Sequence, residues 1–122
     1  MALDRLDHVT VRCSDLARSR SFYTTALGLE DGDRPPFNFP GAWLYVGQRP
    51  VVHLVGGPHD GTKGTGTFDH IAFAATDLEG TRQRLQQAHI DFRETKVPGR
   101  PLHQLFVVDP DGVTIEINVT TA

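Results

Sequence analysis

The chain has 122 residues and a formal net charge of −3, with hydrophobic residues making up 39% and charged residues 22%. This composition is ordinary for a globular protein, and the small negative charge gives no electrostatic support for binding nucleic acid or an anionic membrane. No apolar run approaches the roughly 20 residues of a membrane span, the N-terminus lacks the apolar core of a signal peptide, and the single cysteine excludes an internal disulfide. We therefore expect one cytoplasmic domain over residues 1–122.

The first elements in chain order are a strand and a helix. Apolar and polar side chains alternate over residues 6–13, which predicts a half-buried strand with Cys13 as an inert thiol on its apolar face. Ser14 is then expected to cap a helix, because an apolar stripe at helical spacing follows it. Gly28 is the expected end of this helix.

Two shorter β-type runs complete the first half of the chain. They cover about 41–46 and 50–55, and the turn sequence GQRP at 47–50 lies between them. The following segment, 56–67, contains five glycines and is typical of a flexible linker.

The second half begins with another strand-to-helix sequence, FDHIAFAATDL at 68–78. Thr76 and Glu79 have the spacing of a T-x-x-E capping box, which predicts the start of a second helix. Two more β-type runs follow at 102–108 and 113–119, separated by the turn sequence DPDG.

The two halves repeat one pattern. Five residues recur identically and in the same order: Asp7, His8, Asp15, Leu16 and Arg20 return as Asp69, His70, Asp77, Leu78 and Arg82. Agreement in order and spacing indicates duplication, with one unit over 4–56 and the other over 66–120. A unit of about 60 residues is too small to be comfortably stable alone. We therefore expect the two units to pair edge to edge, with helices on one face and a cup on the other.

Four side chains at equivalent places in the two units are candidate metal ligands: His8, His53, His70 and Glu116. Two lie on first strands and two on last strands, so neighbouring first and last strands would bring all four into the cup. Three imidazoles and one carboxylate suit Zn²⁺, Ni²⁺, Co²⁺, Fe²⁺ or Mn²⁺ better than Ca²⁺ or Mg²⁺. Each residue alone is more often a solvated polar side chain on a wet sheet face, so only their coincidence favours metal binding.

Four further residues are candidates for contacting a substrate. Gln104 and Phe106 precede Glu116 on the neighbouring strand and could line the cup, although ordinary strand packing explains them equally well. Trp43 could stack on a substrate or fill the core. Arg100 could bind a substrate anion or remain a solvated loop residue.

Three segments resemble the vicinal oxygen chelate superfamily: LDHVTVRCSDLARSRSFYTTALGLE at 6–30, FDHIAFAATDL at 68–78 and LFVVDPDGVTIEINV at 105–119. This superfamily includes glyoxalase I, fosfomycin-resistance thiol transferases, methylmalonyl-CoA epimerase, extradiol dioxygenases and metal-free bleomycin-binding proteins. The resemblance covers nearly the whole chain and is specific for a fold rather than for one reaction. It implies an α+β fold of two tandem βαβββ modules that form a cupped mixed sheet.

The resemblance also implies a ligand set. His8, His70 and Glu116 fall on metal-ligand positions, whereas His53 falls where glyoxalase I usually carries a glutamate. A carboxylate on the metal is the natural base for moving a proton between neighbouring carbons, so Glu116 is the expected catalytic residue. With His53 off the metal, the other three resemble the two-His-one-carboxylate triad, which leaves positions for substrate and O₂.

We therefore expect a homodimeric enzyme that uses a divalent metal ion and acts on a small molecule with vicinal oxygens. The expected reaction is that of a lyase or isomerase, in which the metal stabilises an enolate or an oxyanion. A ring-cleaving dioxygenase is the alternative among enzymes. A metal-free protein that sequesters a drug or metabolite is the alternative outside enzymes. Neither nucleic acid nor a membrane is an expected partner.

Overall fold

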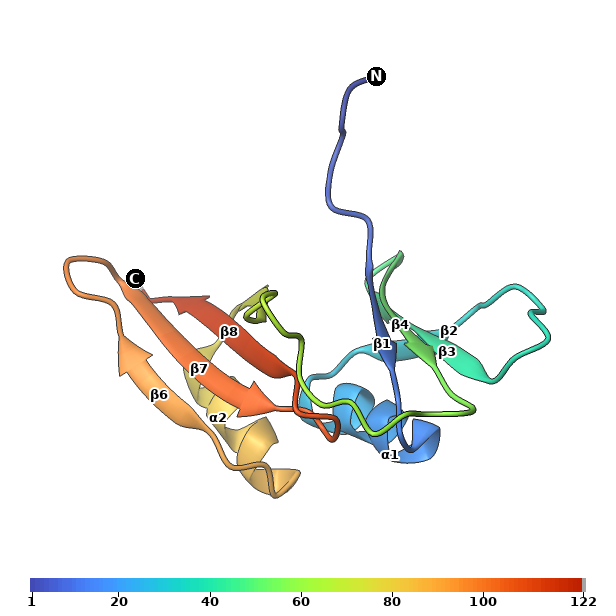
Figure 1. Ribbon diagram of the computed structural model, residues 1–122. Coiled ribbons are helices and arrows are strands. Elements are labelled where there is room, and N and C mark those ends of the chain that lie inside the picture. The colour runs from blue at the N-terminus through green and yellow to red at the C-terminus, as the bar shows by residue number, and fades with distance from the viewer. Residues whose placement is uncertain (122) are drawn as a thin grey trace.

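The computed structural model describes residues 1–121, and each half of the chain forms one four-stranded sheet with a helix against it (Figure 1). The first half contains β1 (Val9–Arg12), α1 (Leu16–Ser21), the π-helical turn η1 (Phe22–Ala26), β2 (Glu30–Gly32), β3 (Gly41–Val46) and β4 (Arg49–Val55). The second half contains β5 (Ile71–Ala75), α2 (Leu78–Gln87), β6 (Arg93–Lys96), β7 (Leu102–Val108) and β8 (Thr114–Thr120). Both halves are therefore βαβββ units, and the chain has the glyoxalase-like α+β fold.

The strand orders are β1-β4-β3-β2 and β5-β8-β7-β6. First and last strands are parallel neighbours in each sheet, because β1 pairs with β4 and β5 pairs with β8. The remaining pairs are antiparallel. The short outer strands β2 and β6 were not individually predicted, because sequences such as EDG and RETK carry no apolar alternation.

Both predicted helix caps are wrong by one residue. The capping side chains are Asp15 and Asp77, which accept the backbone N–H three residues later at 3.1 and 3.0 Å. A carboxylate at a helix N-terminus satisfies an otherwise free donor and also interacts favourably with the helix dipole. Ser14 and Thr76, which were expected to cap, lie one residue outside, and Glu79 pairs with an arginine of its own helix. The true caps are among the residues that the two halves share.

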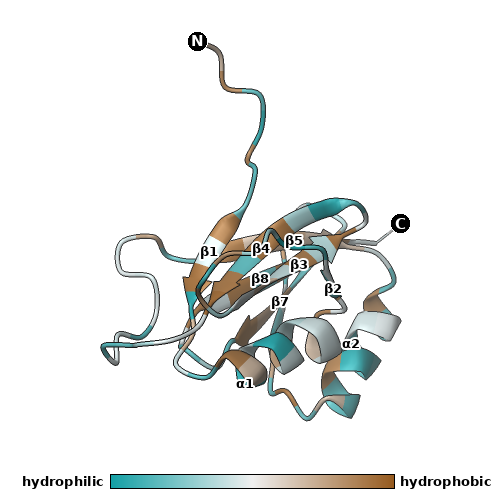
Figure 2. Cartoon of the chain, turned by 90° about the vertical axis from the view of Figure 1, so that its right-hand side faces the viewer, coloured by the Kyte–Doolittle hydropathy of each residue, from teal (hydrophilic) through white to brown (hydrophobic). Residues whose placement is uncertain are grey.

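Apolar residues from both halves form one core. Figure 2 shows apolar stretches, in brown, along the strands that lie above α1 and α2. Alternation along β1 and β4 sends Val11, Val52 and Leu54 into this core, and the β8 residue Ile115 enters it from the second sheet. Cys13 is 1% exposed, so the prediction of a buried thiol is confirmed.

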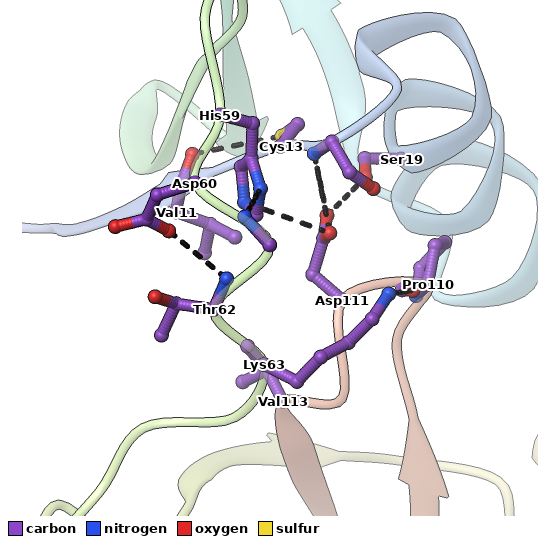
Figure 3. Close-up of polar contacts among 12 residues, drawn as sticks. Val11, Cys13, Ser19, His59, Asp60, Thr62, Lys63, Pro110, Asp111 and Val113 are labelled. Carbon is purple, nitrogen blue, oxygen red and sulfur yellow. Dashed lines mark hydrogen bonds and ion pairs between the residues drawn. The ribbon is translucent and has the colours of Figure 1, made fainter.

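The DPDG turn joins the second half to the first (Figure 3). Asp109 is buried and accepts the hydroxyl proton of Tyr23 at 2.7 Å. Asp111 is also buried and accepts from the backbone N–H of Ser14 at 3.1 Å and the hydroxyl of Ser19 at 3.4 Å. Burial works to raise the pKa of Asp111, but the hydrogen bonds from Ser14 and the nearby Lys63 and His59 together lower that pKa. These buried carboxylates hold the two halves in one arrangement.

The linker closes over this turn from the other side (Figure 3). The backbone N–H of Gly64 donates to the Asp111 carbonyl at 2.8 Å, and Lys63 Nζ donates to the Pro110 carbonyl at 3.4 Å. His59 Nε2 lies 3.9 Å from Asp111 Oδ1. The glycine-rich segment is thus tied to the second half by several contacts.

Within one chain the two sheets remain separate, which differs from the edge-to-edge pairing expected from the sequence. β1 and β5 are each the first strand of their sheet and pair on one side only, with β4 and β8 respectively. The DPDG joint and the packed helices set the two sheets side by side without hydrogen bonds between their edges (Figure 1). No helix among residues 1–121 is long and apolar enough to cross a membrane.

Candidate functional site

The second half places an imidazole against a carboxylate. His70 lies immediately before β5, and its Nδ1 is 2.8 Å from Asp69 Oδ2. Its Nε2 faces Glu116 Oε1 at 3.8 Å. The hydrogen bond with Asp69 raises the pKa of His70, and the nearby Glu116 adds to that effect. An imidazole whose Nδ1 is held by a carboxylate presents its Nε2 in a fixed direction, as metal-binding histidines commonly do.

The Glu116 carboxylate is buried and held on both oxygens. Gln104 Nε2 donates to Oε1 at 3.1 Å, and Asn118 Nδ2 donates to Oε2 at 2.9 Å. The Asn118 Oδ1 atom is buried and has no hydrogen-bond partner among the described residues. Phe106 lies directly across from Glu116 on β7, with the Arg93 guanidinium 4.3 Å from its ring centroid. Gln104 and Phe106 therefore lie beside Glu116, and their contact with a substrate stays a prediction.

The first half places two imidazoles and an indole in a row. His8 lies immediately before β1, and its Nδ1 is 2.7 Å from Asp7 Oδ2. Its ring stacks on that of His53 with centroids 3.7 Å apart and planes 11° apart. Trp43 stacks on the other face of His53 at 4.1 Å and 13°. Burial and the neighbouring His8 lower the pKa of His53.

His53 is not arranged to share a metal ion with His8. An imidazole binds a metal through a lone pair in its ring plane, and two nearly parallel rings direct these lone pairs side by side instead of to one point. The Nε2 atom of His53 also lies 3.0 Å from the Pro50 carbonyl oxygen, so it is already hydrogen-bonded. Only Nδ1 of His53 remains without such a bond in this arrangement.

One chain brings the four predicted ligands together as two pairs. His8 and His53 lie on the first sheet, whereas His70 and Glu116 lie on the second. Among residues 1–121 no group of three or more His, Cys, Asp or Glu side chains is close enough to hold one metal ion. The expectation that one chain gathers all four is therefore not met, because the joint between the halves keeps the sheets apart. Arg100 lies in the exposed turn between β6 and β7, where its backbone N–H donates to the Val97 carbonyl at 3.3 Å.

The donor chemistry of the two pairs fits a divalent ion. His8 and His70 have equivalent partners, since each is held at Nδ1 by the preceding aspartate and leaves Nε2 free for a ligand bond. Glu116 adds a carboxylate that Asn118 Nδ2 orients by a hydrogen bond. The Oδ1 atom of the same asparagine has no hydrogen-bond partner among the described residues. Two imidazoles and one carboxylate suit a transition metal ion.

Comparison with known proteins decides the family. The model of the Glyoxalase/Bleomycin resistance protein/Dioxygenase superfamily matches residues 5–117. The chain belongs to this superfamily. It is 34% identical to Glyoxylase I 4 of Arabidopsis thaliana over 94% of this chain and 70% of that protein. It is 33% identical to a protein of Vibrio cholerae named "Probable lactoylglutathione lyase", over 96% of this chain and 91% of that one.

The fold is also that of a solved fosfomycin resistance protein, FosX from Listeria monocytogenes. The two structures agree with a TM-score of 0.77 over 98% of this chain and 96% of that chain, at 15% sequence identity. At this identity the likeness concerns the fold alone.

Three residues that orient the candidate ligands were not predicted from the sequence. Asp7 and Asp69 precede the two histidines in the repeated Asp-His pair, and that repetition was the signal that could have identified them. Asn118 lies two residues after Glu116 on β8, and alternation along a strand predicts that both share one face.

Proposed function

We propose that the protein is a divalent-metal-dependent lyase or isomerase of the glyoxalase type, acting on a small substrate with vicinal oxygens. The observation that carries this proposal is the matched pair of histidines, each fixed by an aspartate at Nδ1 and free at Nε2. A solvated surface histidine needs no such partner. The recurrence of the aspartate–histidine pair at the same point of the fold in both halves therefore favours binding of a metal ion.

We further propose that the complete site forms between two copies of the chain. The first strands β1 and β5 have unpaired edges, and such edges invite pairing with another chain. Leu6 and Phe68, at equivalent places before the two histidines, are 81% and 60% exposed. A crevice of about 550 Å³ also runs between β1, the linker and β5, with Val9, Ile71 and Phe68 in its wall.

If two copies of the chain are related by a twofold axis between these edges, two equivalent strand contacts form together. In a symmetric dimer, β1 of one copy meets β5 of the other, and the reverse contact follows. His8 of one copy then approaches His70 and Glu116 of the other copy, which unites the two pairs that a single chain keeps apart. The exposed apolar residues before each strand become buried in the same contact.

Each residue of the proposed site has a distinct task. His8, His70 and Glu116 would hold the ion, whose Lewis acidity stabilises negative charge on a substrate oxygen. Glu116 would take a proton from a substrate carbon and return it to the neighbouring carbon. Gln104 and Asn118 keep the carboxylate oriented for this transfer, because each donates to one of its oxygens. Phe106 would exclude water beside the reacting carbon.

The arrangement of His53 supports one alternative. If His53 stays stacked between His8 and Trp43, three ligands remain, and two histidines with one carboxylate suit a ring-cleaving dioxygenase with Fe²⁺. A metal-free binding protein is the alternative outside enzymes. Metal analysis of untagged protein distinguishes the classes, since a protein without affinity for Ni²⁺, Zn²⁺, Mn²⁺ or Fe²⁺ contradicts both enzyme proposals.

Metal titration of variants tests the ligand set. His8→Ala, His70→Ala and Glu116→Ala should each weaken binding by more than about hundredfold, since each loses a direct ligand. His53→Ala should weaken it less than about tenfold, because its Nε2 is already bonded to Pro50. Calorimetry with Ni²⁺ or Zn²⁺ gives the comparison, and His103→Ala on β7 is a matched control.

Mixing two inactive variants tests the shared site. If His8 and Glu116 of different copies meet, a dimer of His8→Ala with Glu116→Ala has one site without defects and one with two. Random mixing should then restore about a quarter of the wild-type lyase activity towards a glutathione hemithioacetal. If each chain built its own site, every site in the mixture would lack one ligand and no activity would return.

A further inference from the structure

The chain before β1 extends away from both sheets (Figure 1). Residues 1–8 belong to no helix or strand, and all of them are exposed. Leu3 and Leu6 are 91% and 81% exposed, although leucine is among the residues most often buried in proteins. Residues 3–8, which we call the arm, therefore present two apolar side chains to solvent in a single chain.

The free edge of β5 is open to a further strand. Among residues 1–121, β5 pairs with β8 on one side only. Its sequence, IAFAA, contains no charge and no proline, which are the usual means of keeping an edge strand from pairing with another chain. Ala72 and Ala74 are exposed and have small side chains, so a second backbone can approach this edge closely.

A cavity of about 550 Å³ adjoins β5 between the two halves of the chain. Its apolar lining comes from both halves and includes Leu27, Leu29, Phe73, Ala75 and Ile117. Leu29 and Ile117 are core residues, so the cavity opens the core towards the free edge of β5. An apolar side chain carried by a strand on that edge would fill a space that a single chain leaves open.

Two equivalent edges can pair in one direction only if both sheets keep their histidines on the same side. β1 and β5 are equivalent strands, and the free edge of each faces away from the last strand of its unit. A half-turn about an axis perpendicular to the sheet brings such edges together, and it makes the two strands antiparallel. In the proposed dimer, His8 of one copy lies opposite His70 of the other. The residues before His8 then run along β5.

This register gives each arm residue a defined neighbour. Counting back from the two histidines, Leu6 lies opposite Ala72 and Leu3 lies opposite Ala75. Ala75 is half-buried and packs against the core, whereas Ala72 is exposed and lies across from Glu116 on β8. Opposite residues of antiparallel strands project from the same face, so Leu3 enters the cavity and Leu6 joins the face that carries Glu116.

Charge also favours the arm as the occupant. Arg5 lies on the same side of the arm as Leu3. The charged residues that line the cavity are Glu30, Asp77 and Arg84, so carboxylates outnumber guanidinium groups there. In a single chain Arg5 pairs with Asp4 of the arm at 2.9 Å, and an exposed pair of this kind contributes little, so docking of the arm loses little by breaking it.

We propose that the arm of one copy adds a strand to the free edge of β5 of a second copy and places Leu3 in its cavity. This inference rests on the proposed function, because the register follows from the meeting of His8 with His70. It also adds a residue to the shared site. Leu6 becomes an apolar wall of the cup, two strand spacings or about 10 Å from Glu116 of the other copy.

Cysteine pairs test the register. Leu6→Cys with Ala72→Cys, and Leu3→Cys with Ala75→Cys, each introduce thiols at positions that the proposal places directly opposite, close enough for a disulfide. Mild oxidation should join two copies in at least one of these double variants and give a band of twice the chain mass on a gel without reductant. The native thiol does not compete, because it is 1% exposed.

Two controls accompany the cross-linking. Leu6→Cys alone should give no band of twice the mass. Leu6→Cys with Phe68→Cys, the pair that parallel strands would bring together, should also run as a single chain. A double-mass band in this second control but in neither test pair would overturn the proposed arrangement.

Leu3→Ser tests the cavity. Leu3 is exposed in a single chain, so the change should leave its fold intact, which circular dichroism can verify. Each of the two cavities of the dimer loses an apolar side chain, so the dissociation constant of the dimer should rise about hundredfold, or about tenfold for each cavity. Sedimentation of metal-free protein measures the constant. Val108→Ser, at an exposed apolar residue of β7, is the matched control and should change it by less than about twofold.

The possible outcomes separate the arm from the metal centre. A wild-type chain that stays monomeric at high concentration would overturn both the arm and the shared site. A dimer that does not cross-link at either pair and is unaffected by Leu3→Ser would overturn the arm, whereas activity restored by mixing His8→Ala with Glu116→Ala would retain the shared site. Cross-linked arms in a protein without affinity for Ni²⁺ or Zn²⁺ would support the arm and remove the metal centre.

Discussion

The two halves of the molecule have the same strand order but different chemistry at the equivalent point. In both, an aromatic residue lies directly across an antiparallel pair from the last-strand candidate: Trp43 across from His53, and Phe106 across from Glu116. In the first half the partner is an imidazole, and the two rings stack. In the second half the partner is a carboxylate, which bonds to Gln104 and Asn118 instead.

This difference shows what duplication conserves. It fixes where a side chain projects, because strand order and alternation determine the face on which each residue lies. It leaves open what the side chain does, since a single change from imidazole to carboxylate exchanges stacking for hydrogen bonding. At this point the first half therefore carries stacked rings, and the second half carries a hydrogen-bonded carboxylate.

The largest expected effect comes from removing the Asp109 carboxylate, which tests whether the two halves depend on each other for stability. Asp109→Ala leaves the Tyr23 hydroxyl and the N–H groups of Asp111 and Val113 without their buried acceptor. We expect a loss of about 4 kcal/mol in the free energy of unfolding, because buried donors lose their charged partner. Urea denaturation measures this loss, and Asp91→Ala at an exposed site is the control. Unchanged stability would show that the turn does not join the halves.

A second test asks whether the repeated Asp-His pairs are equivalent. Asp7→Asn and Asp69→Asn each remove the carboxylate that orients one candidate ligand. We expect both to weaken metal binding by about tenfold, since partners that orient a ligand commonly contribute that much. Asp60→Asn, at an exposed turn of the linker, should have no such effect in the same titration. An effect at only one of the two positions would make the halves unequal in ligation as well as in stacking.

The smallest expected effect concerns the ion pair between Arg82 and Glu94 in the second half, whose counterpart in the first half is Arg20 with Asp31. Hydrogen bonds from Arg82 lower the pKa of Glu94 from 4.5 to about 2, and His103 contributes to this shift. Because the folded-state pKa lies below the unfolded one, the carboxylate stabilises the fold above pH 4.5, and this contribution disappears as the pH falls towards 2. Solvent screening reduces its size to about 1 kcal/mol at neutral pH.

Glu94→Gln provides the measurement. The difference in unfolding free energy between the wild type and this variant should be largest at neutral pH and should decrease from pH 4.5 to 2. Glu30→Gln, in the short outer strand of the first half, is the matched control. A difference that does not vary with pH would show that the pair stabilises the fold through packing alone.

Much of the fold could be predicted because local patterns specify it. Alternation identified β3 and β7 with their observed limits, the repeat identified two similar units, and the family resemblance implied their βαβββ order. The helix caps were misplaced by one residue because serine, threonine and aspartate all suit that position. The outer strands β2 and β6 were missed because their sequences lack apolar alternation, and pairing with β3 and β7 defines them.

The sequence by itself determined the family, the two units and the candidate ligands, since these depend on residue identity and spacing along the chain. The tertiary structure decided how the ligands are grouped. The hydrogen bonds of Asp109 and Asp111 keep the sheets apart, so one chain presents His8 with His53 and His70 with Glu116. It also decided that His53 stacks between His8 and Trp43, because neighbouring strands bring residues distant in sequence into contact.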